Sequence, residues 1–325
     1  MKARLRRRQI RAIDLFSGAG GSSWGAQKAG VKIVAAFDMW KVAASTYQNN
    51  FPKATFYTGK LENRSPRALA KKLGRIDLIL ASPECTNHSP AKGGKPRCEE
   101  SKKTAYQVIR FARAFKPRWI VIENVVSMRG WKRYLYFKRR LEKLGYKIRE
   151  QVLNAAEFGV PQSRRRLFLL CDRVRQPAEI IPTRRGKPKS ASSFVDMNGR
   201  YSFSPLKTKT RAKPTLARAR RAISHVGSRA SFLMVYYGSD AAGGWQRLGA
   251  PLRTITTLDR FALVRPNGSG HKMRMLQVPE LKVAMGMRGM KFIKGTRRDR
   301  VKLIGNAVCP PVMRQAVKTL TAGPL

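Results

Sequence analysis

The sequence predicts an α/β protein built on a largely parallel sheet, followed by a smaller and more basic lobe. Over the first 170 residues, apolar runs of strand length alternate with segments of helical character. Such alternation is typical of βαβ units, in which each helix crosses back over the sheet. Near Gln176 the composition shifts toward basic and small polar residues, and strand-like pieces return only beyond residue 230. We therefore expect two lobes of different size.

The predicted elements of the first lobe begin with a buried strand at 11–16. The turn SGAGG follows and leads into a helix over 22–30, whose N-cap we assign to Ser22 or Ser23. Further strands are predicted at 32–38, 75–82, 117–125 and 165–172, and further helices at 41–51 and 103–115. In the second lobe, 231–238 and 251–264 read as strands, and helical signals resume between 275 and 320.

The charge of the chain predicts a nucleic-acid partner. The 325 residues include 68 Lys and Arg against 18 Asp and Glu, a formal net charge of +50. A compact chain of this charge repels itself unless a polyanion lies nearby, and Lys and Arg that neutralise phosphates release counterions. Residues 184–229 hold 13 Lys and Arg and one acid, Asp196. We expect part of this stretch to be a solvated arm rather than a packed unit.

The sequence lacks the patterns typical of membrane proteins, secreted proteins and zinc-binding proteins. The sequence has no apolar run of 18 residues and no apolar core of a signal peptide near its basic start, so we expect a cytoplasmic protein without a membrane partner. The four cysteines are scattered and form no CxxC pair, which predicts reduced thiols. Cys85, His88 and Cys98 match no common zinc spacing, so we expect no metal.

The glycine-rich turn and the acid beyond it predict a nucleotide site. Gly18, Gly20 and Gly21 lie between a strand and a helix, where backbone can approach a ligand closely. Taken alone, the turn also fits an ordinary tight connection. Asp38 ends the next strand, 20 residues beyond Gly18, where a carboxylate can accept hydrogen bonds from ribose hydroxyls.

Two side chains are predicted to meet at the carboxyl edge of the sheet. Cys85 follows the strand at 75–82, and Glu123 lies near the end of the strand at 117–125. Position alone leaves Cys85 either a nucleophile or a small buried hydrophobe. Glu123 fits either a helix cap or a desolvated acid whose raised pKa suits proton donation. Arg164 and Arg166, two residues apart, fit phosphate binding or the anchoring of a carboxylate or carbonyl.

These pieces, taken in order, resemble the DNA (cytosine-5) methyltransferase family. The matching pieces are DLFSGAGG, Asp38, SPECTNHS, ENV, FGVPQSRRRLF, RMLQVPE and GNAVCPPV, which span residues 13–170 and 274–312. The resemblance implies a Rossmann-like methyltransferase sheet with helices on both faces. It also implies a catalytic domain over 10–172 and 274–325, and a small irregular or β target-recognition lobe over 173–273.

The resemblance further implies a reaction and a set of site residues. A cytosine of double-stranded DNA would be flipped out of the helix, because its ring is unreachable in the stack. The Cys85 thiolate would attack C6, Glu123 would donate near N3, and Arg166 with Arg164 would hold the base and keep the thiol ionised. S-adenosylmethionine would be bound by Phe16, Ser17, Gly18, Gly20, Gly21, Asp38, Pro83 and Asn306. The DNA would be contacted by Ser89, Gln162, Arg253 and Arg260, and we expect the protein to act as a monomer.

The chain departs from the family pattern at several positions. Glu84 stands where the family usually has proline before the cysteine, and Thr86 and His88 replace a glutamine and an aromatic. Because an adjacent carboxylate raises a thiol pKa, we hypothesise that Glu84 is paired with a cation such as Lys92 or Lys95. Lys60 stands where the family often has an acid near the adenine amine. Two alternatives stay open: methylation of cytosine in RNA, and a DNA-binding protein that has lost catalysis.

Overall fold

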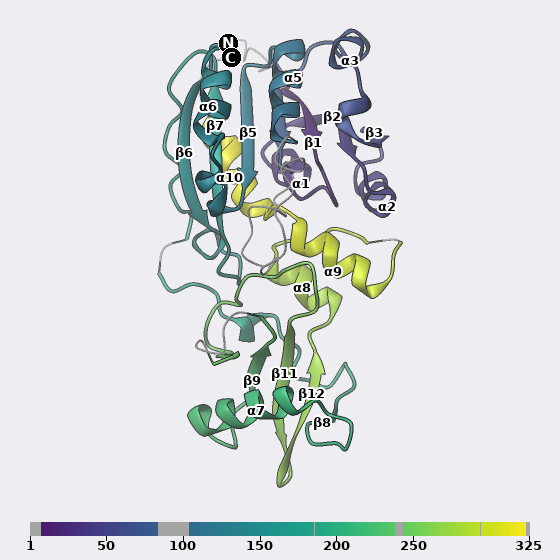
Figure 1. The fold of residues 1–325 in the computed structure, drawn as a ribbon, viewed down its shortest axis with the longest axis vertical. Coiled ribbons are helices and arrows are strands. Elements are labelled where there is room, and N and C mark those ends of the chain that lie inside the picture. Colours follow the sequence, from purple (N-terminus) through teal and green to yellow (C-terminus); the bar gives the residue numbers. More distant parts are fainter. Residues whose placement is uncertain (1–7, 84–103, 185, 238–242, 293, 323–325) are drawn as a thin grey trace, which may run out of the picture.

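The computed structural model of the chain describes residues 8–83, 104–184, 186–237, 243–292 and 294–322. These residues form two lobes stacked along the long axis of the molecule (Figure 1). The larger lobe holds a seven-stranded sheet and the smaller one a five-stranded sheet. Among the described residues, no helix is long and apolar enough to cross a membrane.

The larger sheet confirms the predicted strands and adds two at its edges. Its strands, in spatial order, are β3 (Thr55–Thr58), β2 (Lys32–Asp38), β1 (Arg11–Leu15), β4 (Leu78–Ala81), β5 (Trp119–Asn124), β7 (Arg165–Asp172) and β6 (Lys147–Asn154). The strands from β3 to β5 are parallel, whereas β7 runs antiparallel to both of its neighbours. The sheet is therefore mixed. Sequence patterns missed β3 and β6, because these edge strands are partly exposed and lack a continuous apolar run.

Helices cover both faces of this sheet, as predicted. Leu78 and Leu80 of β4 point into a core shared with α1 (Gly21–Gln27) and α10 (Pro310–Thr321), whereas Ile79 and Ala81 point into a second core. The helices on the second side are α3 (Pro66–Leu73), α5 (Ala105–Phe115) and α6 (Tyr134–Glu142). Helix α2 (Lys41–Asn50) follows β2, and 3-10 turns occupy Leu61–Asn63, Val126–Gly130, Ala155–Phe158 and Ala191–Ser193.

The smaller lobe is an antiparallel sheet with one helix packed on it. Its strands are β10 (Trp245–Arg247), β9 (Phe232–Val235), β11 (Phe261–Asn267), β12 (Gly270–Met275) and β8 (Ser204–Pro205). Strand β11 starts at Phe261, so the first half of the strand predicted at 251–264 is irregular chain. Strand β12 also runs past residue 274, the boundary that the sequence predicted between the two domains.

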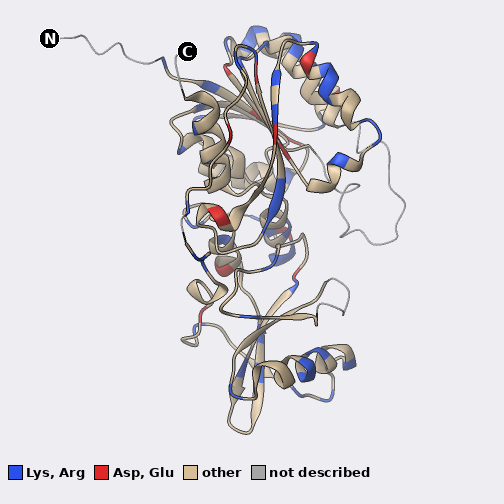
Figure 2. Cartoon of the chain, turned by 90° about the vertical axis from the view of Figure 1, so that its left-hand side faces the viewer, with Lys and Arg blue, Asp and Glu red and all other residues tan. Residues whose placement is uncertain are grey.

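The basic stretch contains a packed helix rather than only a solvated arm. Helix α7 (Lys213–Val226) buries Thr215, Ala219 and Ala222, which lie on one face at helical spacing. These small side chains let the helix lie against the sheet, while Arg220 and Arg221 remain exposed. The small buried face explains why composition alone suggested a solvated segment. Figure 2 shows the Lys and Arg residues along this helix and over both lobes.

The C-terminal helices return to the larger lobe and fix the glycine turn. Helices α8 (Val278–Ala284) and α9 (Arg297–Asn306) lie between the lobes, and α10 packs against α1, β5 and β7. This packing requires glycine in α1. A Cβ on Gly25 would lie 2.5 Å from the carbonyl oxygen of Pro310, and one on Gly21 would collide with the carbonyl oxygen of Val308. The first and last helices are therefore in backbone contact.

We expect Gly21→Ala to destabilise the protein, because the added methyl group meets backbone rather than a flexible side chain. Overpacking of this kind lowers the free energy of unfolding by about 1–3 kcal/mol, which denaturant titration would measure. Gly130→Ala is the matched control, since a Cβ there meets no atom within 4 Å. Equal stabilities of the two variants would contradict the close approach of α1 and α10.

A buried hydrogen-bond network lies beneath the glycine turn and corrects the predicted helix cap. The N-cap of α1 is Gly20, not Ser22 or Ser23. Ser23 instead donates its hydroxyl to the carboxylate of Asp14 at 2.6 Å and lies 2.6 Å from the Tyr47 hydroxyl. Asp14 is fully buried, and desolvation raises its pKa from 3.8 to about 7. Its second carboxyl oxygen has no hydrogen-bond partner among the described residues.

The raised pKa of Asp14 predicts a pH-dependent stability. Between pH 3.8 and about 7 the unfolded chain is ionised at Asp14 and the folded chain is not. The free energy of unfolding therefore falls as pH rises through this window, by up to about 1.4 kcal/mol per pH unit. We expect Asp14→Asn to gain stability over the wild type at pH 8 and to gain much less near pH 4, in denaturant titrations. An equal gain at both pH values would contradict the assignment.

Candidate functional site

The predicted site residues gather where the parallel strands of the larger sheet end. Strands β1, β2, β4 and β5 run in the same direction, so their carboxyl ends share one edge. In open α/β sheets this edge is the usual place for ligands. Cys85 and Ser89 lie outside the described residues, so their predicted roles stay predictions.

The glycine turn between β1 and α1 binds the carboxylate of Asp38. The backbone N–H of Gly18 donates to Asp38 Oδ2 at 2.8 Å, and that of Trp40 donates to Oδ1 at 2.9 Å. Phe16 precedes the turn with a φ of 59°, an unfavourable conformation for a side chain of this size. The Ser82 hydroxyl donates to its carbonyl oxygen at 3.1 Å. The residue that follows β4 thus holds the backbone of Phe16 in place.

The three glycines of the turn have different surroundings. A Cβ on Gly20 would collide with the ring of Phe51, and one on Gly21 with Val308, so these two glycines serve packing. Gly18 has a φ of +51°, and a Cβ there would meet nothing within 4 Å. Gly18 and the partly exposed Asp38 therefore border open space. An acceptor carboxylate next to bare backbone fits a nucleoside with a ribose.

The ends of β4 and β5 are tied together by Asn124. Its side-chain amide donates to the carbonyl oxygen of Pro83 at 3.1 Å and its oxygen accepts from Val125 N–H at 2.8 Å. Pro83 is buried and lies two residues before Cys85. The chain that carries the candidate nucleophile therefore leaves the sheet next to Glu123. Asn124 is part of the motif ENV, but no local pattern predicts this bridging role.

Glu123 is a buried acid that forms an ion pair with Arg166. Its side chain is 8% exposed, and Arg166 Nε lies 3.3 Å from Glu123 Oε1. Burial raises the pKa of Glu123, while the guanidinium groups of Arg166 and Arg164 oppose the shift. This confirms the desolvated acid, rather than the helix cap, of the two readings of Glu123. An acid of raised pKa beside a cation can donate a proton and stabilise negative charge.

Arg164 and Gln162 join the two lobes. Arg164 is 3% exposed, and its guanidinium donates to the carbonyl oxygens of Ile255 at 3.0 Å, Gly305 at 2.9 Å and Ala307 at 3.2 Å. Gln162 is fully buried; its amide donates to Ala284 O at 3.0 Å and its oxygen accepts from Ile255 N–H at 2.9 Å. A side chain held in this way does not reach DNA, which contradicts the predicted DNA contact of Gln162.

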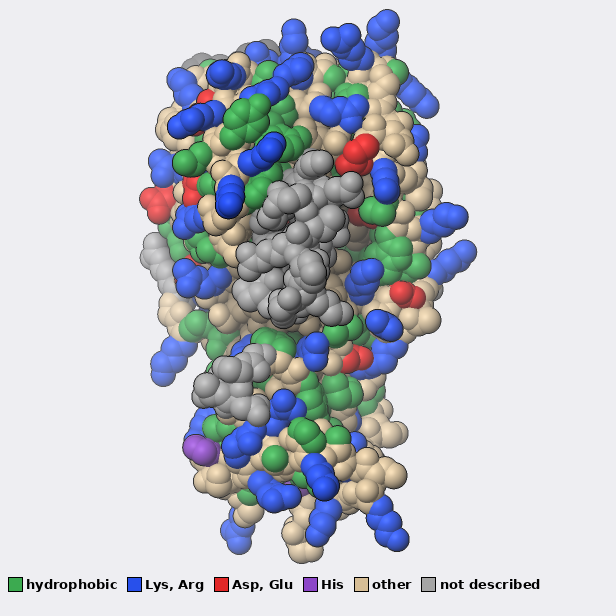
Figure 3. All heavy atoms as spheres, viewed as in Figure 1, with side chains coloured by type: hydrophobic (Ala, Val, Ile, Leu, Met, Phe, Trp, Pro, Cys, Tyr) green, Lys and Arg blue, Asp and Glu red, His purple; other side chains and the backbone are tan. Residues whose placement is uncertain are grey.

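The remaining predicted residues lie around the junction of the lobes. Asn306 ends α9 and is exposed, and its neighbours Gly305 and Ala307 accept hydrogen bonds from Arg164. Arg253 is partly exposed, and its backbone N–H donates to Gln246 Oε1 at 3.0 Å. Arg260 precedes β11 and donates to the carbonyl oxygen of Tyr236 at 2.9 Å. Figure 3 shows Lys and Arg spread over both lobes on the face viewed in Figure 1.

Local patterns predicted no role for Asp14 or Tyr47 beneath the glycine turn, and only a helix cap for Ser23. An acid inside the apolar strand AIDL is a usable signal, because a buried carboxylate needs partners. The identity of those partners depends on how α1 and α2 pack, which no local pattern records. Among the described residues, no group of three or more His, Cys, Asp or Glu side chains is arranged to hold a metal ion.

The fold resembles that of solved methyltransferase structures. The chain superposes on a triple mutant of Spodoptera frugiperda DNMT2 with a TM-score of 0.72 and 19% identity, covering 96% of this chain and 99% of the other. It superposes on a putative DNA modification methyltransferase encoded within a prophage of E. coli with a TM-score of 0.69 and 18% identity, covering 96% and 98%. At these identities the similarity establishes the fold.

Comparison with curated sequences gives relatives that are longer than this chain. Type II methyltransferase M.AgeI of Thalassovita gelatinovora is 34% identical over 168 residues, which are 49% of this chain and 39% of that protein. Type II methyltransferase M.XorII of Xanthomonas oryzae is 31% identical over 204 residues, 60% of this chain and 48% of that protein. The matched region thus spans less than half of each relative.

A family model covers nearly the whole chain. The model describes the C-5 cytosine-specific DNA methylases, and it matches residues 10–322, which include both lobes and the C-terminal helices. The match agrees with the glycine turn, the buried acid–arginine pair and the methyltransferase-like sheet. The chain belongs to the C-5 cytosine-specific DNA methylase family.

Proposed function

We propose that the protein transfers a methyl group from S-adenosylmethionine to C5 of cytosine in double-stranded DNA. The observation that carries the proposal is the Glu123–Arg166 pair, buried at the carboxyl edge of the sheet beside the segment that leads to Cys85. Family membership supports the reaction class. The net charge of +50 supports a polyanionic substrate.

The cofactor would lie against the glycine turn. Gly18 offers bare backbone next to open space. The carboxylate of Asp38, which the N–H groups of Gly18 and Trp40 orient, would accept hydrogen bonds from the ribose hydroxyls. Phe16, Ser17 and Pro83 border the same edge, and the exposed Asn306 lies at the end of α9. When bound, S-adenosylmethionine supplies the methyl group.

The chain's own residues would handle the base. The target cytosine is flipped out of the duplex, since its ring atoms are inaccessible in the stack. The Cys85 thiolate forms a bond to C6, and electron density moves toward C5 and N3, where Glu123 donates a proton. C5 would take the methyl group, with S-adenosylhomocysteine as the leaving group, and N3 would return its proton to the Glu123 carboxylate. C5 would then lose its proton to solvent, its C–H electrons would re-form the C5–C6 double bond, and the Cys85–C6 bond would break, which restores the thiolate. Arg166 positions Glu123 through their ion pair.

The smaller lobe would place the duplex, with the catalytic unit over 10–172 and 274–325 and the recognition lobe over 173–273. Exposed Arg220 and Arg221 on α7 suit contacts to phosphates, which position a protein on DNA without reading its sequence. Each such contact steepens the salt dependence of binding by about 0.9 in log–log slope. We propose a monomer that acts beside DNA in the cytoplasm.

We expect purified protein to form 5-methylcytosine in mixed-sequence duplex DNA, and Cys85→Ala to form none. The reason is that alanine cannot form the bond to C6 that makes C5 of the cytosine nucleophilic. The measurement is mass analysis of nucleosides after incubation with S-adenosylmethionine at physiological salt. Cys98→Ala is the matched control, because it removes a thiol from the same segment without touching the proposed nucleophile.

The alternatives would give different results in that assay. A protein that modifies structured RNA and leaves duplex DNA unmodified would establish the RNA substrate in place of DNA. Tight duplex binding with neither DNA nor RNA methylated would establish a catalytically silent DNA binder. Full activity of Cys85→Ala would refute the covalent step while leaving methyl transfer intact.

Glu123→Gln should lower the rate of methyl transfer by about 10²–10⁴-fold, because it removes a proton donor without changing shape. A raised pKa keeps Glu123 protonated at a higher pH than an ordinary glutamate, and the proposed donor is lost as pH rises through that pKa. The single-turnover rate of the wild type should therefore fall as pH rises through the pKa of Glu123. The rate of Glu123→Gln should show no such fall. Binding of S-adenosylhomocysteine, measured by calorimetry, should stay the same in both. A variant with wild-type rates at every pH would remove Glu123 from the reaction.

A further inference from the structure

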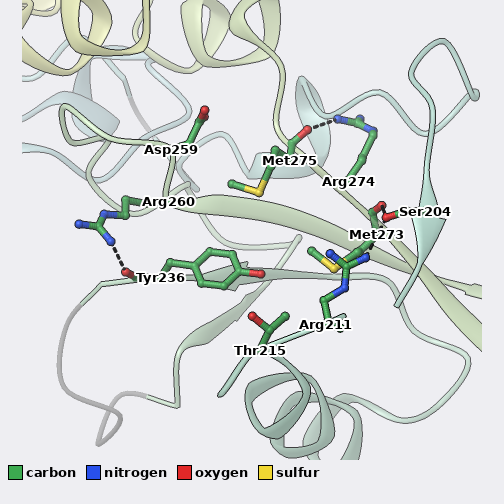
Figure 4. A pocket seen from close by; sticks show the side chains of 9 residues that line it. All are labelled: Ser204, Arg211, Thr215, Tyr236, Asp259, Arg260, Met273, Arg274 and Met275. Carbon is green, nitrogen blue, oxygen red and sulfur yellow. Dashed lines mark hydrogen bonds between the residues drawn. The ribbon is translucent and has the colours of Figure 1, made fainter. Parts of the chain in front are cut away.

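The smaller lobe contains a pocket that is separate from the glycine turn and from Glu123. Its volume is about 460 Å³, and it lies between α7, the start of β11 and the end of β12 (Figure 4). The lining residues are Ser204, Arg211, Thr215, Tyr236, Asp259, Arg260, Met273, Arg274 and Met275. The ring of Tyr236 extends across the middle of this space in Figure 4. We call it the Tyr236 pocket.

Two arginines of the Tyr236 pocket are held in place and keep donors to spare. Arg211 donates through Nε to Leu206 O at 3.2 Å and through Nη2 to Ser204 Oγ and Pro205 O at 2.9 Å. Arg260 donates through Nη1 to Tyr236 O at 2.9 Å. Nη1 of Arg211, and Nε and Nη2 of Arg260, have no hydrogen-bond partner among the described residues. A guanidinium fixed by backbone is organised in advance for a ligand.

The other charged groups of the pocket are already paired. Arg274 is buried and forms an ion pair with Glu280 at 2.7 Å, and it also donates to Asp196 O at 2.8 Å. Asp259 accepts from Arg297 through both of its oxygens, at 2.9 and 3.1 Å. The excess positive charge of the pocket therefore belongs to Arg211 and Arg260. A ligand that presents hydrogen-bond acceptors could bind the remaining N–H groups of both arginines.

The walls of the pocket favour a base edge over a phosphate group. Met273, Met275 and the Tyr236 ring supply apolar surface, and Asp259 places a carboxylate on the rim. A carboxylate repels phosphate, and phosphate contacts need no apolar walls. Base edges, in contrast, combine acceptors with apolar ring atoms. Guanine presents the adjacent acceptors O6 and N7, which arginine binds with two parallel donors.

Hydrogen bonds join the smaller lobe to the larger lobe near the pocket. Arg164 donates to Ile255 O, and the hydroxyl of Thr254 donates to Ser163 O at 2.9 Å. The Tyr237 hydroxyl in turn donates to Thr254 O at 2.9 Å. Tyr236 and Arg260 therefore lie at the end of the smaller sheet that is joined to the strand carrying Arg166. A duplex engaged at Glu123 would meet this end of the lobe.

We propose that the Tyr236 pocket is the base-reading site of the smaller lobe and that it reads guanine through the parallel Nε and Nη2 donors of Arg260, with Nη1 of Arg211 as a further single donor. The inference rests on the proposed function, because it takes duplex DNA as the substrate. In this proposal, two half-buried arginines determine the sequence specificity of DNA binding. The exposed arginines of α7 then contribute affinity for DNA but no sequence specificity.

The test is selection of bound duplexes from a random-sequence library at physiological salt, followed by sequencing. It uses the full chain and does not depend on methyl transfer, so failure of the inference and failure of the proposed reaction can be told apart. The variants are Arg260→Lys, which keeps the charge but loses the fork of parallel donors, and Arg211→Lys, which keeps the charge but loses the single Nη1 donor. Arg220→Lys, at an exposed position of α7, is the matched control. Circular dichroism of each variant checks folding.

We expect the wild type to enrich a motif that contains guanine and each pocket variant to lose preference at a guanine position. The loss should be about 5- to 150-fold for Arg260→Lys, the range of a bidentate contact to a base, and smaller for Arg211→Lys, which loses a single donor. Total binding to the library should change little, and Arg220→Lys should keep the full motif. Three outcomes would overturn the proposal: no motif in the wild type, an intact motif in both pocket variants, or an equal loss in Arg220→Lys.

Discussion

The structure depends on one buried guanidinium, that of Arg164. It binds three carbonyl oxygens that belong to two distant parts of the chain, one between β10 and β11 and one at the end of α9. Hydrogen bonds from a charged donor are stronger than neutral ones, and carbonyls at a helix end need partners. Strand β7 begins directly after Arg164, and its second residue, Arg166, pairs with Glu123. The position of the smaller lobe and the position of the acid are therefore fixed by two arginines that are two positions apart.

Buried acids are rare in this chain and each has a distinct environment. Asp172 accepts from the Trp119 ring nitrogen at 3.0 Å and lies 3.5 Å from Arg118, and Glu280 pairs with Arg274. Glu123 pairs with Arg166. Asp14 differs, since it has hydroxyl partners but no ion pair among the described residues. In a chain with 68 cations, an unpaired buried carboxylate is maintained by packing rather than by lack of available charge.

Local patterns predicted the parts of the molecule that local physics determines. The central strands are continuous apolar runs, and the spacing from Gly18 to Asp38 places both at one sheet edge, where they are hydrogen-bonded. Patterns failed where the deciding partner is distant. The family resemblance implied a DNA contact for Gln162, yet Ile255 and Ala284 hold its side chain in the interior. Ser23 fits a helix cap in sequence, but Asp14 takes its hydroxyl. The packed face of α7 consists of small residues that composition does not distinguish from a solvated arm.

The contact between α1 and the segment just before α10 has a consequence for folding. Gly21 meets the backbone of Val308, so the helix beside the glycine turn is completed by a segment that is far away along the chain. Contacts of such long sequence separation carry a large entropic cost of closure and form late. Until then the apolar face of α1 and of the first strands remains open to solvent or to other chains. The sheet edge that carries the glycine turn is thus encoded in the first strands but becomes a finished surface only when the segment at Val308 has packed on α1.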